Sequence, residues 1–186
     1  MQIEYRAVTP NDTEALSALG RDSFCDAFAH LYSAENLNMF LEKSYAMPVI
    51  ASEIKDPNRL YHVAASGDEL LGYCKLKLRT DFAGETRADM AGRKIIDLSQ
   101  LYLRSDVTGK GIGDALMRWV LGHAKQHGYN DILLSVYAEN LGAQRFYARY
   151  GFTKYADTYF MVGNHRDDEF LYRLALTDCS MGSSQV

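Results

Sequence analysis

Three glycines open the most regular helical pattern in the chain, within residues 105–124, SDVTGKGIGDALMRWVLGHA. Gly109, Gly111 and Gly113 stand where Ser, Thr, Asp or Asn would cap a helix at lower entropic cost. Glycines at this place leave the unpaired N–H groups of the helix accessible, so that a phosphate can lie against the backbone. The feature predicts a strand, a glycine turn and a helix start that binds an anion. The alternative is a tight turn without a ligand.

Two common phosphate-binding patterns do not match this turn. The P-loop of NTPases requires Lys followed by Ser or Thr, but here Lys110 is followed by Gly111. A dinucleotide-binding turn requires Gly-x-Gly-x-x-Gly in an early βαβ unit, and the glycines here are spaced by two and two. The turn therefore matches neither of these two nucleotide-binding patterns.

The remaining hydrophobic patterns predict one α/β domain on a mixed sheet. Alternating or continuous apolar runs predict strands at residues 3–8, 59–79 (a hairpin about Gly67), 94–104, 131–137, 152–162 and 168–176. Helical periodicity and capping residues predict helices at 11–24, 33–45, 112–128 and 140–151. We expect 81–93 to be a loop or a wide hairpin connection, 1–176 to form the domain and 177–186 to be a flexible tail.

Composition excludes several other classes. With 47% hydrophobic residues, a net charge of -4 and no basic cluster, the chain is expected to be globular and not to bind nucleic acid. Cys25, Cys74 and Cys179 are too few and too widely spaced for a disulfide framework or a zinc site. His123 and His127 have metal-ligand spacing but no evident third ligand, so no metal is expected. The absence of an apolar leader or spanning run predicts a cytoplasmic protein without a membrane partner.

Two consecutive segments, LYLRSDVTGKGIGDAL and LLSVYAENLGAQRFYARYGF, together resemble the acyl-CoA-binding core of the GCN5-related N-acetyltransferase (GNAT) family. The resemblance covers residues 95–155 closely. It implies a single α/β domain whose mixed central sheet has about six or seven strands, with splayed central strands flanked by helices. It also implies acetyl-CoA as the co-substrate.

The resemblance carries the family's cofactor-binding positions onto this sequence. They are Leu101, Tyr102, Leu103, Thr108, Gly109, Lys110, Gly111, Ile112, Gly113, Asp114, Asn140 and Tyr147. Thr108 departs from the family pattern, which has Gln or Arg there. Because backbone N–H groups supply most of the phosphate contact, this departure predicts weaker binding of CoA, with Lys110 restoring some charge.

The same resemblance assigns three catalytic roles. The Leu103 N–H would polarise the thioester carbonyl, and the Tyr147 hydroxyl would protonate the departing thiolate. Asp97, placed by strand alternation on the same face as Ser99 and Leu101, is a candidate base for the attacking amine. Each has a structural alternative: Leu103 and Tyr147 as core residues, and Asp97 as an ion-paired strand carboxylate.

The acceptor is predicted from weaker signals. The sequences 21–45 and 157–174 resemble bacterial spermidine/spermine N-acetyltransferases, and Asp22, Asp26 and Glu35 could attract a polycation. The prediction is therefore direct transfer of acetyl in a ternary complex to a small cationic amine such as a polyamine. The alternatives are an amino acid, an antibiotic, a protein N-terminus or a longer acyl group, or a non-catalytic acyl-CoA-binding module. The Tyr-rich late strands make a homodimer plausible.

Overall fold

The structure, a computed structural model, describes residues 2–78 and 90–176. Within these residues seven strands form one mixed sheet in the order β1-β2-β3-β4-β5-β7-β6. The strands are β1 (Glu4–Ala7), β2 (Arg59–Ser66), β3 (Glu69–Lys77), β4 (Ile95–Leu103), β5 (Asp131–Tyr137), β6 (Thr153–Val162) and β7 (His165–Ala175). Neighbouring strands are antiparallel except for the parallel pair β4 and β5. The predicted mixed α/β sheet is confirmed.

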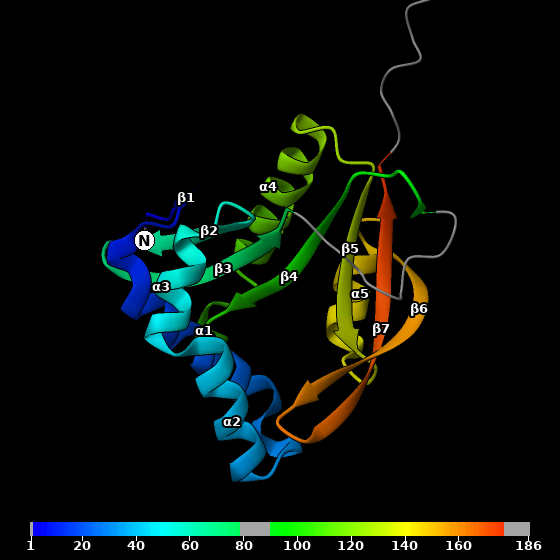
Figure 1. The fold of residues 1–186 in the computed structure, drawn as a ribbon. Helices are drawn as coiled ribbons and strands as arrows, with labels where there is room; N and C mark the ends of the chain where they lie inside the picture. The colour runs from blue at the N-terminus through cyan, green and yellow to red at the C-terminus, as the bar shows by residue number, and fades with distance from the viewer. Residues whose placement is uncertain (1, 79–89, 177–186) are drawn as a thin grey trace, which may run out of the picture.

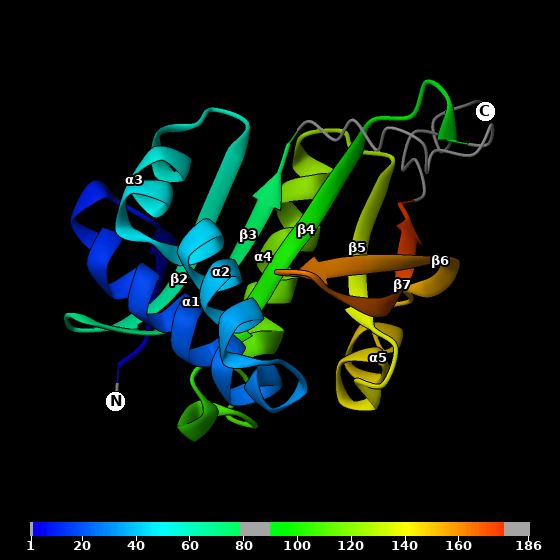
Figure 2. The same ribbon diagram turned by 60° about the horizontal axis from the view of Figure 1, so that its bottom comes forward.

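Helices cover both faces of this sheet (Figures 1 and 2). On one face lie α1 (Thr13–Phe28), α2 (Ala34–Tyr45) and α3 (Met47–Lys55), which pack on β2 and β3 around one buried cluster. On the other face α4 (Ile112–Gln126) and α5 (Leu141–Ala148) enclose a second cluster. No helix of the described residues is long and apolar enough to cross a membrane.

The sequence patterns do not predict α3. It is short and carries Pro48 in its first turn, a residue that usually signals the end of a helix. At the first helical positions the missing N–H of proline has no intrahelical partner to lose, so Pro48 starts the helix. Elsewhere the boundaries shift by a few residues: α1 begins at Thr13 and extends to Phe28. Residues 177–186 and most of the expected 81–93 loop lie outside the described residues.

The sheet opens in its middle, between β4 and β5. These strands pair only from Ile95 to Asp97 with Asp131 to Leu133, and then diverge towards the glycine turn (Figure 1). The hairpin of β6 and β7 reaches across to the first set of helices (Figure 2), where the N–H of Asn164 donates to Oδ1 of Asn36 at 2.8 Å. The split central strands expected from the resemblance are therefore present.

A β-bulge at Ser99 changes which face of β4 its residues occupy. Lys75 of β3 pairs with Gln100 and Leu76 pairs with Leu98, so Ser99 is an extra residue. The expectation that Asp97 shares a face with Leu101 is wrong, because one inserted residue inverts the alternation beyond it. Leu101 packs with the α4 cluster, whereas Asp97 lies opposite Lys77 on the face of α1 to α3.

Candidate active site

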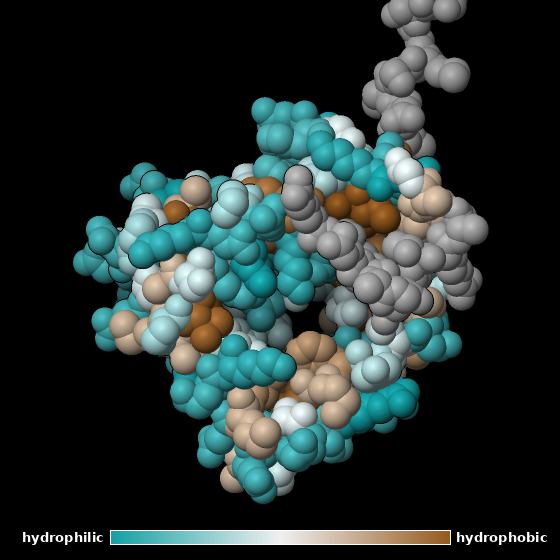
Figure 3. All heavy atoms as spheres, in the orientation of Figure 1, coloured by the Kyte–Doolittle hydropathy of each residue, from teal (hydrophilic) through white to brown (hydrophobic). Residues whose placement is uncertain are grey.

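A cavity of about 940 Å³ lies where β4 and β5 diverge. Its walls come from α1, α2, α3, β2, β3, β4, β5, the start of α4, α5 and the hairpin of β6 and β7. Figure 3 shows a hollow at the place where Figure 1 shows the two strands parting. Of the residues expected to bind the cofactor or catalyse, the cavity wall holds Asp97, Leu101, Tyr102, Leu103, Thr108, Gly113, Asn140 and Tyr147.

The open edge of β4 presents backbone groups to the cavity. The N–H of Arg104 bonds to the carbonyl of Leu71 at 3.0 Å, which fixes the antiparallel register with β3. By alternation, the peptide groups of Leu101 and Leu103 point away from β3, towards β5. Consistent with this direction, the hydroxyl of Ser23 donates to the Leu103 carbonyl at 3.3 Å. The Leu103 N–H is thus placed to meet a ligand in the split.

The edge of β5 that faces β4 also presents backbone groups to the cavity. The N–H of Ala138 bonds to the carbonyl of Asp168 on β7 at 3.0 Å. The alternation then turns the peptide groups of Ser135 and the N–H of Tyr137 away from β7 and towards β4, while the Tyr137 carbonyl accepts from the N–H of Asn140 at 2.9 Å. An extended ligand that lies between the strands can therefore pair with both edges, as an added strand would.

The glycine turn forms the start of α4. Gly109 and Gly111 have φ angles of 76° and 82°, which L side chains rarely adopt, and a Cβ at either would meet nothing within 4 Å. The first helical bond runs from Ala115 to Gly111, so the N–H groups at 112–114 have no helical partner and can receive an anion. Gly113 differs, because it packs against Leu103 and leaves little room for a side chain. The predicted strand, glycine turn and helix are confirmed.

Three polar side chains lie near the glycine turn, and two of them already have partners within the protein. The Thr108 hydroxyl donates back to the Ser105 carbonyl at 2.8 Å, and Lys110 is exposed. The Asp114 carboxylate accepts from the Tyr150 hydroxyl and pairs with Arg118 at 2.5 Å. Asp114 therefore offers an anion its backbone N–H, while its side chain joins α4 to the turn that follows α5.

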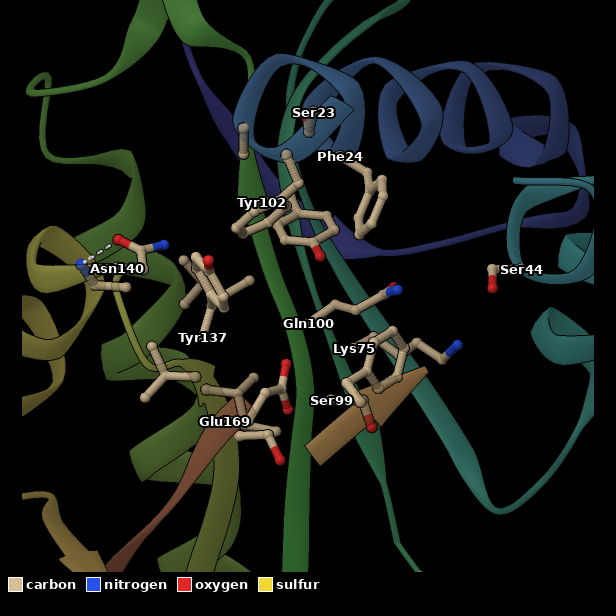
Figure 4. A pocket seen from close by; sticks show the side chains of 18 of the residues that line it. Ser23, Phe24, Ser44, Lys75, Ser99, Gln100, Tyr102, Tyr137, Asn140 and Glu169 are labelled. Carbon is tan, nitrogen blue, oxygen red and sulfur yellow. Dashed lines mark hydrogen bonds between the residues drawn. The ribbon is translucent and has the colours of Figure 1, made fainter. Parts of the chain in front are cut away.

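Asn140 precedes α5 as its N-cap, and Tyr147 lies within the helix. Oδ1 of Asn140 accepts from the N–H of Ala143 at 3.0 Å, so Asn140 caps the helix (Figure 4). Its amide nitrogen remains for a ligand, and the residue lines the cavity. Tyr147 lines the cavity too, with its ring edge-on to Phe146 and Phe152. Burial raises the pKa of Tyr147 well above its ordinary value, so its hydroxyl keeps a proton that it can donate.

Glu169 is a site residue that the sequence analysis missed. It lies on β7, points into the cavity beside β4 (Figure 4), and bonds to the Ser135 side chain. Among the described residues no cation pairs with it. Burial, reinforced by the charge of Asp167, raises the pKa of Glu169 to about 7. A carboxylate of this pKa can accept a proton near neutral pH. In the sequence, Glu169 stands out only as the last of three consecutive acidic residues, DDE, directly before the apolar strand pattern FLYRLAL.

The carboxylate of Asp97 has stronger interactions with its neighbours than the carboxylate of Glu169 has. Its carboxylate accepts from the Ser99 hydroxyl at 2.6 Å and lies 3.7 Å from the Lys77 ammonium. Burial raises the pKa of Asp97, and Lys77 and Ser99 act against that shift. Asp97 therefore lines the cavity as a member of an ion pair.

The carboxylates expected to attract a polycation lie elsewhere. Asp22, Asp26 and Glu35 are exposed and do not line the cavity. The acidic residues that do line it are Glu53, Asp97, Asp167 and Glu169. Within 2–78 and 90–176 no group of three or more His, Cys, Asp or Glu residues could hold a metal ion.

The opened strand pair, the anion-binding helix start and the hydroxyl of the half-buried Tyr147 form a site for a long thioester that carries phosphates. That is the site of an acyl-CoA-dependent transferase. Residues 25–152 match the model of the acetyltransferase (GNAT) family, and the chain belongs to this family. It is an acyl-CoA-dependent acetyltransferase, and acetyl-CoA is its co-substrate.

Relatives and solved structures agree with this assignment. The chain is 28% identical to an uncharacterized N-acetyltransferase of Lactobacillus delbrueckii subsp. lactis, over 91% of this chain and 95% of that one. It is 27% identical to a spermidine N(1)-acetyltransferase of Thermoplasma acidophilum, over 85% and 92% of the two chains. The fold matches that of the PaiA N-acetyltransferase of Thermoplasma acidophilum, solved in complex with coenzyme A, with a TM-score of 0.76 and 24% identity over 95% and 100% of the two chains.

Proposed function

We propose that the protein transfers acetyl directly from acetyl-CoA to a small primary amine, with Glu169 as the base. The observation that carries this proposal is the position of Glu169, a half-buried carboxylate without a cationic partner among the described residues, on the wall of the same cavity as Leu103 and Tyr147. An ammonium group is the natural partner for such a carboxylate.

Glu169 has a defined task in this reaction. An alkylamine has a pKa near 10, so exposing its lone pair at neutral pH costs about 4 kcal/mol. Glu169 accepts one proton from the ammonium group and passes it to solvent. The nitrogen then attacks the carbonyl carbon, and the Leu103 N–H stabilises the negative charge that develops on the carbonyl oxygen.

Tyr147 completes the proton balance. As the C–N bond forms and the C–S bond breaks, Tyr147 donates its proton to the sulfur and takes up the second proton of the amine. The products are an amide, a free thiol and one proton released through Glu169. Asp97, the base considered from the sequence, is the alternative to Glu169, and its ion pair with Lys77 makes it the weaker candidate.

Cofactor contacts follow from the same geometry. We infer that the edges at 101–103 and at 135–137 hold the extended arm of the co-substrate, with Tyr102 on the opposite face of β4. The N–H groups at 112–114, preceded by Thr108, Gly109, Lys110 and Gly111, receive its phosphates. The amide nitrogen of Asn140 serves the same ligand.

Polyamines are amines of the proposed class, and a relative at 27% identity carries the name of a spermidine acetyltransferase. The panel of acceptors that tests the proposal therefore includes spermidine and spermine beside amino acids and simple alkylamines. A cytoplasmic location and the domain limits 1–176 are kept as predictions. A homodimer is proposed through β6, an edge strand that exposes Tyr159, Phe160 and Met161.

The test is amine-dependent release of CoA thiol, compared between the wild type and Tyr147→Phe. We expect release with a primary amine and a fall of at least about tenfold in the variant, because thiolate departure loses its proton donor. Tyr129→Phe, on a tyrosine outside the cavity whose hydroxyl bonds to the Leu78 carbonyl, is the matched control. Binding of acetyl-CoA without release by any amine would instead favour a binding module.

A further inference from the structure

The charged side chains that line the cavity form two groups, one at each end. Asp167 and Glu169, both from β7, lie at one end. The other end is lined by residues of β3, α2 and α3, and Lys75 and Ser44 mark it in Figure 4. That end contains four cations and two carboxylates: Lys43, Arg59, Lys75, Lys77, Glu53 and Asp97.

Among the residues that the structure describes, positive charge is in excess at the second end. Glu53 is shared by two cations, Lys75 at 2.6 Å and Arg59 at 2.9 Å. Arg59 has a further partner in Asp56, outside the cavity, at 3.1 Å. Counting Asp56 as well, three carboxylates face four cations.

Two of these cations have capacity for a ligand. The Lys77 side chain is 44% exposed, and its ion pair with Asp97 at 3.7 Å leaves donors of the ammonium group for a second acceptor. Lys43 is exposed, lines the cavity and forms no ion pair among the residues that the structure describes. By contrast, Lys75 is 8% exposed and is held by Glu53. An anion at this end would therefore meet Lys77 and Lys43 first.

The spacing of the two ends limits the size of the ligand. Three steps between neighbouring strands separate β7 from β3, which is at least about 14 Å between backbones. The divergence of β4 and β5 adds to this distance. Side chains from both ends shorten the gap, but the amino and carboxyl groups of an α-amino acid share one carbon and cannot reach both. A ligand that uses both ends carries its two charges several bonds apart.

We propose that the acceptor is an amine with a carboxylate at the far end of its chain, its ammonium group at Glu169 and its carboxylate at Lys77 and Lys43. This inference rests on the proposed function and narrows it. A polyamine would instead place a second ammonium group among four cations, which like-charge repulsion disfavours.

Three amines of nearly equal length test the inference: ε-aminocaproate, hexylamine and hexamethylenediamine. They differ at the far end, which is a carboxylate, a methyl group or an ammonium group. We expect kcat/KM for ε-aminocaproate to exceed that for hexylamine by about tenfold, the effect of one hydrogen bond between charged groups, and hexamethylenediamine to be the poorest. Equal or better use of either of the other two would overturn the inference.

Lysine variants locate the carboxylate site. Lys77→Met and Lys43→Met keep the aliphatic stem and remove the charge, and both side chains are exposed enough for the fold to tolerate the change. We expect each to lower the ratio of kcat/KM for ε-aminocaproate over hexylamine by several-fold. Lys125→Met, at an exposed residue of α4 outside the cavity, is the matched control. A ratio that falls in neither cavity variant would overturn the assignment of these lysines.

The test separates this inference from the proposed function. If no amine releases CoA thiol from the wild-type protein, the proposed transfer itself fails. If all three amines support release with similar kcat/KM, transfer stands and the carboxylate end is wrong. A KM for acetyl-CoA measured with every variant shows that the cofactor site is intact.

Discussion

At the scale of single residues, Glu169 makes the most specific prediction. A base must be deprotonated to act, so kcat/KM should rise with pH through about 7, the pKa of Glu169, and level off above it. Glu169→Gln keeps the shape of the side chain and cannot accept a proton. We expect it to lower kcat/KM by about a hundredfold or more and to abolish this limb of the pH profile.

Asp97→Asn provides the comparison, because it removes the other carboxylate considered for this role. If the limb near pH 7 disappears in Asp97→Asn and persists in Glu169→Gln, then Asp97 is the base. The profile of each variant is measured with a neutral-ended amine, so that titration of the substrate is the same throughout.

Residues of the site differ in how far the sequence could locate them. Asn140 and Tyr147 belong to a motif with fixed spacing, and both line the cavity. The face of Asp97 was predicted wrongly, because nothing in the sequence marks a bulge at Ser99. Glu169 was missed for another reason: its importance depends on burial and on the approach of β7 to the split, which are tertiary properties.

At the scale of elements, the β6 and β7 hairpin depends on one glycine. Gly163 has a φ of 59°, and a Cβ there would lie 2.7 Å from the Asn36 Cα on α2. Gly163→Ala should lower the free energy of unfolding by about 2 kcal/mol, from left-handed strain and overpacking, and raise KM for the amine as the hairpin moves. Urea denaturation and steady-state kinetics measure the two effects.

Gly67→Ala is a matched control for this prediction. Gly67 has a φ of 60° at the turn between β2 and β3, but a Cβ there would meet nothing within 4 Å. Gly67→Ala should lower the free energy of unfolding by about 1 kcal/mol, from left-handed strain alone, and leave KM for the amine unchanged. Equal losses of stability in the two variants would mean that contact with α2 does not constrain the hairpin.

Elements were predicted well where periodicity is strong and poorly where a local signal misleads. The glycine turn and α4 follow directly from the sequence, since positive φ angles at Gly109 and Gly111 are a local requirement. Pro48 concealed α3. The crossing of the β6 and β7 hairpin to α2 depends on contacts between residues more than a hundred positions apart, such as Asn36 with Asn164, which no local pattern encodes.

At the scale of the whole molecule, stability should depend on pH through His62. This ring stacks on Trp119 with centroids 4.0 Å apart, and burial lowers the pKa of His62 to about 4 from 6.5. Because the unfolded chain binds the proton more readily, stability is fully present above pH 6.5 and falls as pH decreases towards 4. Urea midpoints across this range should fall less for His62→Phe than for the wild type. Parallel curves would contradict this account.

Glu169 acts in the opposite direction within an overlapping range. Its raised pKa favours the protonated folded state, so its contribution is fully present below 4.5 and is lost as pH rises through about 7. In the wild type the contributions of His62 and Glu169 therefore partly cancel in the dependence of stability on pH. Comparing His62→Phe in the presence and absence of Glu169→Gln separates the two contributions.

The opened sheet also has a consequence for self-association. Beyond Ile95–Asp97 and Asp131–Leu133, β4 and β5 each present unpaired backbone groups, a kind of edge on which another chain can add a strand and begin aggregation. Here those edges lie inside the molecule, between helices on both faces and beside a hairpin anchored on α2. The contacts that enclose the substrate thus also protect the protein from its own copies, and a variant that frees the hairpin would endanger solubility as well as catalysis.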